Sequence, residues 1–218
     1  MPSPDSNATQ PAGAGARAAV GAAPAASQTW DYLAAELSEI AALARTAGGT
    51  SEFYPELLRR AVAAVAAEGG AVWLPTGGAW RQVCIVEPAS RPTDASQQHQ
   101  RQLLLSEAVR ASRAIVFPAR SRGESGAAEN RSDYVIVVAP VAGAPGAGEA
   151  PPAALIELSL ATGLSPAAYE GVKDYLSAVA DIAAEFHAFH QLAQLTRVHQ
   201  SQRRLLQLGQ RAHASLDL

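Results

Sequence analysis

The sequence is poor in cysteine, in lysine and in long apolar runs, and these shortages narrow the kinds of protein it can encode. The single cysteine, Cys84, excludes an internal disulfide framework and a zinc site made of several cysteines. No stretch reaches the roughly 18 consecutive apolar residues of a membrane-spanning helix. The N-terminus also lacks the charged and leucine-rich parts of a signal peptide. We therefore expect a soluble protein in a reducing compartment, the cytoplasm.

Charge is equally sparse. Charged residues make up 17% of the 218 residues and hydrophobic residues 48%, and Lys173 is the one lysine among 17 basic residues. The formal net charge is −3 and no block of basic residues is present, which argues against nucleic acid as a partner. The length and composition suit one medium-sized domain with extensions.

The first 28 residues consist mainly of small and polar residues. We expect residues 1–28 to form a disordered leader, because they cannot bury enough apolar surface to offset the entropy of ordering them. An amphipathic helix is predicted next, capped by Thr29 and ended by Gly48 and Gly49. Its apolar residues recur at intervals of three and four: Trp30, Leu33, Leu37, Ile40 and Leu43.

A second helix is predicted in "SEFYPELLRRAVAAVAAEGG". Ser51 is its expected N-cap, and Gly69 and Gly70 are expected to stop it. Its expected buried face consists of Phe53, Leu57, Leu58, Ala61, Val62 and Val65.

The spacing of apolar residues then changes to that of strands. "AVWLP" and "WRQVCIVE" are rich in β-branched and aromatic residues, and "TGGA" between them predicts a hairpin. Simple alternation along the second run predicts one shared face for four side chains: Trp80, Gln82, Cys84 and Val86. Two charged residues on predicted strands, Arg81 and Glu157, are expected to lie at the surface or at a sheet edge.

The remaining elements complete an α+β pattern. A helix "RQLLLSEAVRAS" and a strand "AIVFP" are predicted, then a mobile loop "ARSRGESGAAENRS" and two strands, "DYVIVVAPV" and "AALIELSLA". Since the first of these two strands is apolar on both faces, both sides of the sheet should be covered there. A long final helix starts with Ser165 as cap and Pro166 at its first position. The order predicts a largely antiparallel sheet of about five or six strands flanked by helices.

Two segments carry a resemblance to a known family. "ELLRRAVAAVAAEGGAVWLP" resembles the opening helix and first strand of a GAF domain, a sensory fold related to PAS. "AALIELSLATGLSPAAYEGVKDYLSAVADIAAEF" resembles the closing strand and helix of that family. The resemblance covers residues 50–193 and implies a non-catalytic sensory or regulatory module. With it, we divide the chain into the leader, a GAF-like domain over 29–193 and a connector helix over 194–218.

A narrower resemblance concerns the context of the domain. "TWDYLAAELSEIAALA", "FYPELLRRAV", "GGAVWL" and "AHASLDL" are similar to the N-terminal region of bacterial proteins in which GAF-like domains precede a membrane-fusion (HlyD-like) adaptor of an efflux or secretion system. This similarity implies that the chain is part of a larger, membrane-associated protein, which would meet the membrane through domains beyond this sequence.

The sequence departs from the ligand-binding branches of the family. The Asn-Lys-x-x-x-Phe-x-x-x-Asp motif of cyclic-nucleotide-binding members is missing, and Cys84 lies too early to be the bilin attachment site of phytochrome-type members. For haem, His99 is the sole candidate axial ligand, and it lies in a polar stretch. We therefore predict no cofactor.

The resemblance nevertheless points to a candidate pocket on one sheet face. In GAF domains that bind small molecules, the pocket lies beneath the middle helix. The positions that would line it here are Trp73, Cys84, Val86, Phe117 and Tyr134. The alternative is that these residues are ordinary core, because few polar groups converge near them to fix a ligand. We predict no catalytic residues, since no phosphate loop, nucleophile elbow or paired acids stand in a suitable context.

The final helix carries a second signal. An apolar stripe on its first part places His190 against the domain, and after Leu192 the stripe rotates to another face. The later stripe predicts a homodimer contact of the connector helix through Leu195, Val198, Leu205 and Leu216. No metal site is predicted from the histidines, because His199 lies about 13 Å beyond His190 on a helix.

Two functions follow from these patterns. The first is a ligand-sensing module, and the second is a degenerate GAF domain that serves only for dimerisation or scaffolding. An open cavity with convergent polar groups beneath residues 96–117 would favour the first, and a filled core there would favour the second.

Overall fold

The computed structural model describes residues 22–86, 94–123, 126–143 and 151–216, and leaves out the side chains of residues 22–28 and of most residues after 194. Eleven elements follow one another in these ranges: α1 (Ala22–Thr46), α2 (Thr50–Ala64), β1 (Gly69–Thr76), β2 (Ala79–Val86), α3 (Ala95–Ala111), β3 (Ile115–Phe117), β4 (Ser121–Arg122), β5 (Glu129–Asn130), β6 (Val135–Val141), β7 (Ala154–Leu160) and α4 (Pro166–Leu216).

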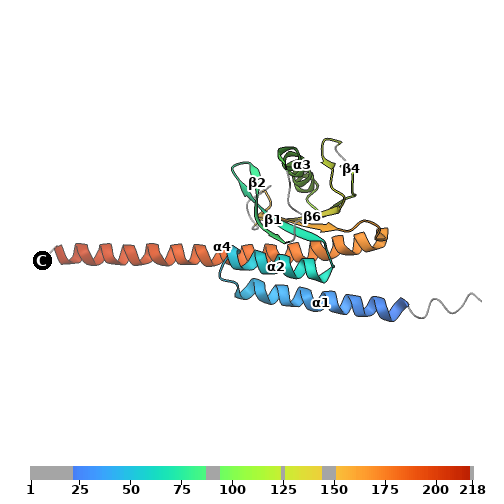
Figure 1. Ribbon diagram of the computed structural model, residues 1–218. Helices are drawn as coiled ribbons and strands as arrows, with labels where there is room; N and C mark the ends of the chain where they lie inside the picture. The colour runs from blue at the N-terminus through green and yellow to red at the C-terminus, as the bar shows by residue number, and fades with distance from the viewer. Residues whose placement is uncertain (1–21, 87–93, 124–125, 144–150, 217–218) are drawn as a thin grey trace, which may run out of the picture.

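A five-stranded antiparallel sheet in the order β2-β1-β7-β6-β3 lies at the centre of the molecule. Helices α1, α2 and α4 lie on one side of it, and α3 with the short β4–β5 pair lies on the other (Figure 1). The predicted α+β class and the predicted antiparallel sheet are therefore confirmed.

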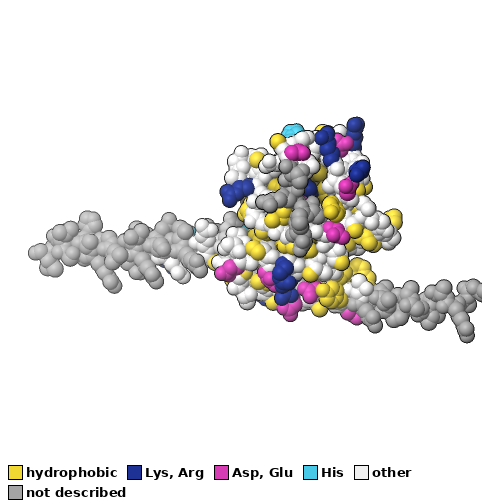
Figure 2. All heavy atoms as spheres, in the orientation of Figure 1, with side chains coloured by type: hydrophobic (Ala, Val, Ile, Leu, Met, Phe, Trp, Pro, Cys, Tyr) yellow, Lys and Arg dark blue, Asp and Glu magenta, His cyan; other side chains and the backbone are white. Residues whose placement is uncertain are grey.

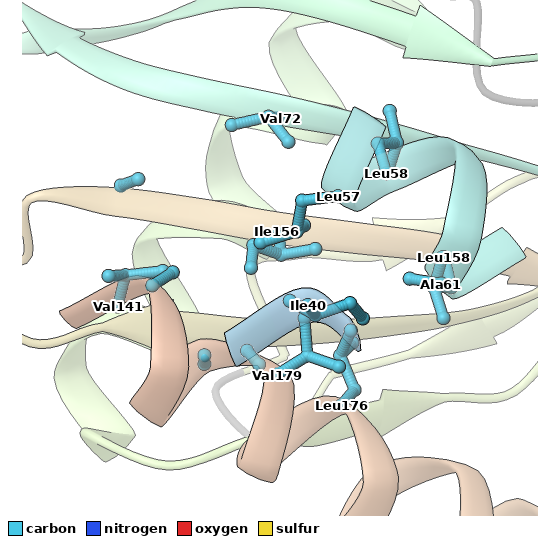
Figure 3. Packing of buried hydrophobic residues seen from close by; sticks show 14 of the residues in the cluster. Ile40, Leu57, Leu58, Ala61, Val72, Val141, Ile156, Leu158, Leu176 and Val179 are labelled. Carbon is cyan, nitrogen blue, oxygen red and sulfur yellow. The ribbon is translucent and has the colours of Figure 1, made fainter. Parts of the chain in front are cut away.

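The face toward α1, α2 and α4 is closed by an apolar cluster, which we call the helix-side core. Its central residues come from three helices and from the inner strands (Figure 3): Ile40, Leu57, Leu58, Ala61, Val72, Val141, Ile156, Leu158, Leu176 and Val179. Leu57, Leu58 and Ala61 confirm the predicted buried face of the second helix, on which Tyr54 is also buried. Non-directional burial of apolar surface holds these helices to the sheet.

The opposite face is closed by a smaller cluster, which we call the α3-side core. Its buried members are Ala71, Trp73, Leu104, Leu105, Ala108, Ile115, Phe117, Ala128, Ile136, Val138 and Leu155. Strand β6 alternates between the two cores, with Ile136 in the α3-side core and Val137 in the helix-side core. Coverage of both faces of this strand is therefore confirmed.

The β1–β2 hairpin forms as predicted, but it contains a bulge that changes which side chains share a face. Gly77 and Gly78 form its two-residue turn with positive φ values of 58° and 87°. Val72 pairs with Cys84 while Trp73 pairs with Gln82, so Val83 is an extra residue on β2. The prediction of one shared face is therefore wrong, because the bulge shifts the alternation along β2. Trp80 packs against the α3-side core, whereas Cys84 and Val86 pack against the helix-side core.

The predicted ends of the first two helices are wrong in detail. Helix α1 begins at Ala22 instead of after Thr29, within the segment expected to be disordered; residues 1–21 lie outside the described residues. Trp30, expected on the buried face, is 57% exposed.

Helix α2 shows two further differences. It starts at Thr50, where Gly49 is the N-cap residue, so Ser51 lies within the helix. Glu52 in the first turn accepts a hydrogen bond of 2.9 Å from the Gly48 amide, so this backbone N–H just before the helix has a partner. The helix ends before Ala66, which has φ of 50°, and Gly69 and Gly70 already belong to β1.

The segment between β3 and β6 is more ordered than the sequence suggests. Strands β4 and β5 pair within the stretch expected to be a mobile loop, of which residues 124–125 lie outside the described residues. Asn130 fixes this pair, because its buried amide donates to the carbonyls of Phe117, Pro118 and Tyr134 at 2.9–3.0 Å.

Helix α3 is also longer than predicted. Asp94 accepts a hydrogen bond from the Gln97 amide and caps the helix start, so the polar residues 95–100 form its first turns.

Helix α4 starts as predicted, with the Ser165 hydroxyl accepting from the Ala168 amide. Its first half follows the helix-side core through Leu176, Val179, Ala183 and Phe186, and its second half extends away from the domain (Figure 1). Leu195, Val198, Leu205 and Leu216 lie in this second half, and their side chains are outside the described residues. No described helix is both long enough and apolar enough to cross a membrane.

Candidate functional site beneath helix α3

A fully buried carboxylate lies at the centre of the sheet, on the side that faces α3. Glu157 of β7 is 0% exposed. One of its oxygens accepts a hydrogen bond of 2.7 Å from Arg101 of α3, and the other accepts one of 3.0 Å from the indole of Trp73 on β1. The prediction that Glu157 is a surface or edge charge is therefore wrong, whereas Arg81 is exposed as expected. We call Trp73, Arg101 and Glu157 the buried triad.

The carboxylate of Glu157 has hydrogen-bond partners only while the three members of the triad stay in contact. Burial raises the pKa of Glu157, and the Arg101 charge and the Trp73 hydrogen bond oppose that rise. Displacement of the Arg101 guanidinium from Glu157 would leave a buried, unpaired ion. The triad thus fixes the position of α3 against the two central strands β1 and β7.

A small polar hollow of about 60 Å³ adjoins the triad, between the start of α3 and the β5–β6 segment. Its lining residues are Gln97, Gln100, Arg101, Leu104, Glu129, Asn130, Arg131, Ser132 and Ile136. Most of its polar groups already have partners. Gln100 accepts from the Glu129 amide, Arg131 pairs with Glu129 at 2.8 Å, and Ser132 donates to Asn130.

The size of the hollow limits what it can hold. A water molecule needs on the order of 10–15 Å³ of such space, so the hollow takes a few waters or a molecule of a few heavy atoms. Pockets for nucleotides and drug-sized ligands measure about 300–1,000 Å³. The space beneath α3 is thus mostly filled by the α3-side core, with polar groups converging on a small remainder.

The structure separates the five residues predicted to line a ligand pocket. Trp73 and Phe117 are buried in the α3-side core, while Cys84 and Val86 pack against the helix-side core on the opposite face of the sheet. Tyr134 is half-buried just before β6, where its carbonyl accepts from Asn130. Because the sheet lies between them, these five residues do not line one pocket.

The other candidate reactive groups are buried or exposed without forming a cluster. Burial raises the pKa of the Cys84 thiol to about 11, a value at which little thiolate forms near neutral pH. His99 is exposed on α3. Within the part of the chain that the structure describes, no three His, Cys, Asp or Glu side chains are grouped so that they could hold a metal ion.

A larger groove of about 490 Å³ lies on the other side of the molecule, where the start of α4 meets α1 and the end of α2. It is lined almost entirely by apolar residues: Thr29, Trp30, Leu33, Ala64, Val65, Ala66, Leu164, Ala167, Ala168, Gly171 and Val172. On the face drawn in Figure 2, by contrast, basic and acidic side chains lie beside one another around α3 and the β4–β5 pair.

Solved structures with low sequence identity share this fold. The A. aeolicus Nlh2 GAF domain in an inactive state superposes with a TM-score of 0.56 at 10% identity, covering 74% of this chain and 99% of that one. The GAF domain of a putative sensor histidine kinase from Pseudomonas syringae pv. tomato gives a TM-score of 0.56 at 14% identity, over 81% and 99% of the two chains. The chain therefore has the fold of a GAF domain, as the sequence resemblance implies.

The same fold also occurs in an enzyme. The free methionine-R-sulfoxide reductase from Neisseria meningitidis, solved with its substrate, superposes with a TM-score of 0.52 at 11% identity, covering 72% of this chain and 89% of that one. No protein-family model and no curated protein matches the sequence. At these identities the likeness shows the fold alone, so any role must be argued from the side chains.

Sequence reasoning missed the buried triad. A signal was present for one part of it: Asp94 followed three residues later by Gln97 marks a helix start, and this would have placed Arg101 on an α3 long enough to reach the sheet. No local signal marks Glu157 as its partner, because the two residues are far apart in the sequence.

Proposed function

We propose that this chain is a non-catalytic sensory or regulatory module of the GAF type, in which the position of α3 is coupled to α4 through the sheet. The observation that carries the proposal is the alternation along β7. Glu157 holds α3 through Arg101, while the neighbouring Ile156 and Leu158 belong to the core that holds α4. Because packed interiors transmit small displacements, a shift of α3 would reach the face that carries α4.

The input of such a module would be a small polar molecule or anion in the hollow beside Arg101. The guanidinium groups of Arg101 and Arg131 line it, and such groups suit oxygens carrying negative charge. The ligand would have to be small, or α3 would have to move outward to admit it.

The proposal is tested with defined probes: formate, nitrate and urea, each at about 10 mM, an excess large enough to reveal millimolar binding. We expect at least one probe to raise the midpoint of thermal unfolding of the full chain and to shift the Arg101 side-chain NMR signals. The test variant is Arg131→Gln, which removes a lining donor without touching the triad and should weaken the binding of that probe. If no probe binds, the sensing role fails.

A second role is favoured by the filled space beneath α3. With a hollow of only about 60 Å³, the domain fits a degenerate GAF module that serves as a scaffold and binds no ligand. In this case the same probes leave the unfolding midpoint unchanged, while the chain still forms a dimer.

In either role we propose that the output is a homodimer formed through the second half of α4. Phe189 and Leu192 are 59% and 69% exposed, so two large apolar side chains lie uncovered where the helix leaves the domain. Leu195, Val198, Leu205 and Leu216 would continue this contact at coiled-coil spacing. Light scattering after gel filtration tests the proposal. We expect a dimer for the full chain and a monomer for Leu205→Glu, with Gln207→Glu as the control.

The sequence resemblance supports a biological setting. We propose that the module belongs to the N-terminal part of a membrane-associated, HlyD-like efflux or secretion adaptor and lies on its cytoplasmic side. Reading the genomic DNA downstream of the codon for Leu218 tests this proposal. An open frame that continues into an adaptor domain supports it, and a stop codon there contradicts it.

A further inference from the structure

Helix α4 leaves the domain within a single turn. Phe186 is 1% exposed and stacks on Phe53 of α2 with ring centroids 4.0 Å apart. One turn later Phe189 is 59% exposed, and Leu192 beyond it is 69% exposed. The contact between the domain and α4 therefore ends around residues 186–190, and side chains there decide how firmly α4 is held.

A hydrogen bond between the two helices lies at this exit point. Tyr54 of α2 is 1% exposed, and its hydroxyl shares a hydrogen bond of 2.5 Å with Nε2 of His187 on α4. His187 itself is half-buried. On the next turn His190 lies over the Phe186 ring, at a centroid distance of 4.1 Å, and donates from Nδ1 to the Phe186 carbonyl. Two histidines thus lie side by side where the domain releases the helix.

The surroundings of His187 offer little to balance a positive charge. From α2 it meets Tyr54, from its own helix it meets His190, and beyond Tyr54 lies the protonated thiol of Cys84 on β2. The residues of α1 in the same core, Ile40 and Ala44, carry no charge. The charged residues that flank the α1–α2 turn, Arg45 and Glu52, are exposed. Among the residues that the structure describes, neither histidine forms a salt bridge with a carboxylate.

We propose that Tyr54, His187 and His190 form a pH-sensitive latch that holds α4 against α2 at neutral pH and loosens it in mildly acidic solution. A neutral His187 fits the half-buried site beside Tyr54. A protonated His187 would place an uncompensated charge between aromatic rings and next to a second histidine. Release of this turn into water hydrates the charge and separates it from the core.

The direction of the pH effect follows from the pKa of His187. Burial, and secondly the nearby His190, lower the pKa of His187 below its ordinary value of 6.5. The closed latch therefore binds fewer protons than the open one. Its full stability is present above pH 6.5 and is lost as the pH falls from 6.5 toward the lowered value.

Hydrogen exchange of the full chain, read by mass spectrometry over residues 183–191 and corrected for the intrinsic pH dependence, measures the opening directly. If the pKa of His187 is one unit lower in the closed latch than in the open latch, acidification can raise the equilibrium constant for opening by up to tenfold. We expect exchange in this segment to rise about three- to tenfold between about pH 7.5 and about pH 5.5.

Three variants make this test decisive. In His187→Gln the pH dependence should disappear, because the titrating group is gone. In His199→Gln, which removes an exposed histidine of the same helix, it should remain. In Tyr54→Phe, exchange should already be faster at neutral pH, because the hydrogen bond between the helices is lost.

NMR titration of the wild-type histidine side chains provides a readout that needs no variant to fold. We expect the titration midpoint of His187 to lie below its ordinary value of 6.5. An exchange rate in residues 183–191 that is independent of pH, or that keeps its pH dependence in His187→Gln, would overturn the latch. A His187 with a titration midpoint at or above 6.5 would overturn it equally.

Discussion

On the face of the sheet covered by α1, α2 and α4, strand β7 contributes Ile156 and Leu158, whereas on the α3 face the same strand contributes Glu157. The helix-side core is built from aliphatic and aromatic side chains, and its helices are held by burial of apolar area. The α3-side core is smaller and contains a charged pair whose members must meet with the right geometry.

The two faces of the sheet therefore hold their helices in different ways. Apolar burial is strong but non-directional, so it stabilises the contact of α4 with the sheet without fixing one position. A buried ion pair adds little net stability compared with a hydrophobic replacement, but it is costly to break and therefore defines one position for α3. We infer that the α3 face sets the state of the domain and that the α4 face transmits it.

The largest expected effect comes from breaking the buried triad. Glu157→Gln leaves the Arg101 charge buried and unpaired, which should lower the free energy of unfolding by about 3–5 kcal/mol. Urea denaturation measures it. Glu170→Gln is the matched control, since Glu170 pairs with Lys173 at the surface and its loss should change little.

A double variant tests whether the ion pair defines the position of α3 without adding net stability to the fold. In Arg101→Met with Glu157→Leu, both charges are removed together, and most of the stability lost in Glu157→Gln should return. If the double variant is as unstable as Glu157→Gln, the triad contributes stability in its own right, and the contrast between the two faces is wrong.

A second prediction concerns Cys84, which packs against the helix-side core. With its thiol pKa raised from 9.0 to about 11, the thiolate fraction at pH 8 is about a hundredfold lower than that of an unperturbed thiol. We expect alkylation by iodoacetamide to be slower by a factor of about one hundred than for a cysteine in an unfolded peptide. Full reactivity should return in urea. Rapid alkylation of the folded chain would contradict the burial of Cys84 and reopen thiol chemistry as a function.

The smallest effect is expected from Gly70→Ala, which tests the close packing of β1 against α2. A Cβ atom at Gly70 would lie 2.8 Å from a methyl group of Leu58 and 2.9 Å from the Glu157 carbonyl. Gly70→Ala should therefore lower the free energy of unfolding by about 1–3 kcal/mol, because the backbone contact cannot yield. Gly171→Ala is the control: its Cβ meets nothing within 4 Å, and alanine in a helix should raise stability by roughly 0.5–1 kcal/mol. Thermal unfolding of the two variants should move in opposite directions.

The fold could be predicted well from the sequence because its signals are local. The spacing of Phe53, Leu57 and Leu58, the Gly77–Gly78 turn and the Ser165 cap each act within a few residues. The helix boundaries were less predictable. Gly49 is the N-cap of α2 and Ala66 takes a positive φ after its end, and other residues could fill both positions.

The candidate site could not be predicted, because it depends on contacts between distant segments. Glu157 is the one charged residue in strand β7, and only the fold brings Arg101 to it. The bulge at Val83 has no sequence signature, and it alone moves Cys84 and Val86 away from Trp73. Likewise, the half-buried site of His187 follows from Tyr54, which lies on another helix.

The coupling of α3 to α4 across the sheet is tested most directly by hydrogen exchange in Arg101→Met with Glu157→Leu, compared with wild type under the same conditions. If the sheet transmits the position of α3, amide exchange must change in α3 and also in residues 176–186 of α4, which do not contact the substituted side chains. A change confined to α3, β1 and β7, with residues 176–186 exchanging as in wild type, would contradict the account.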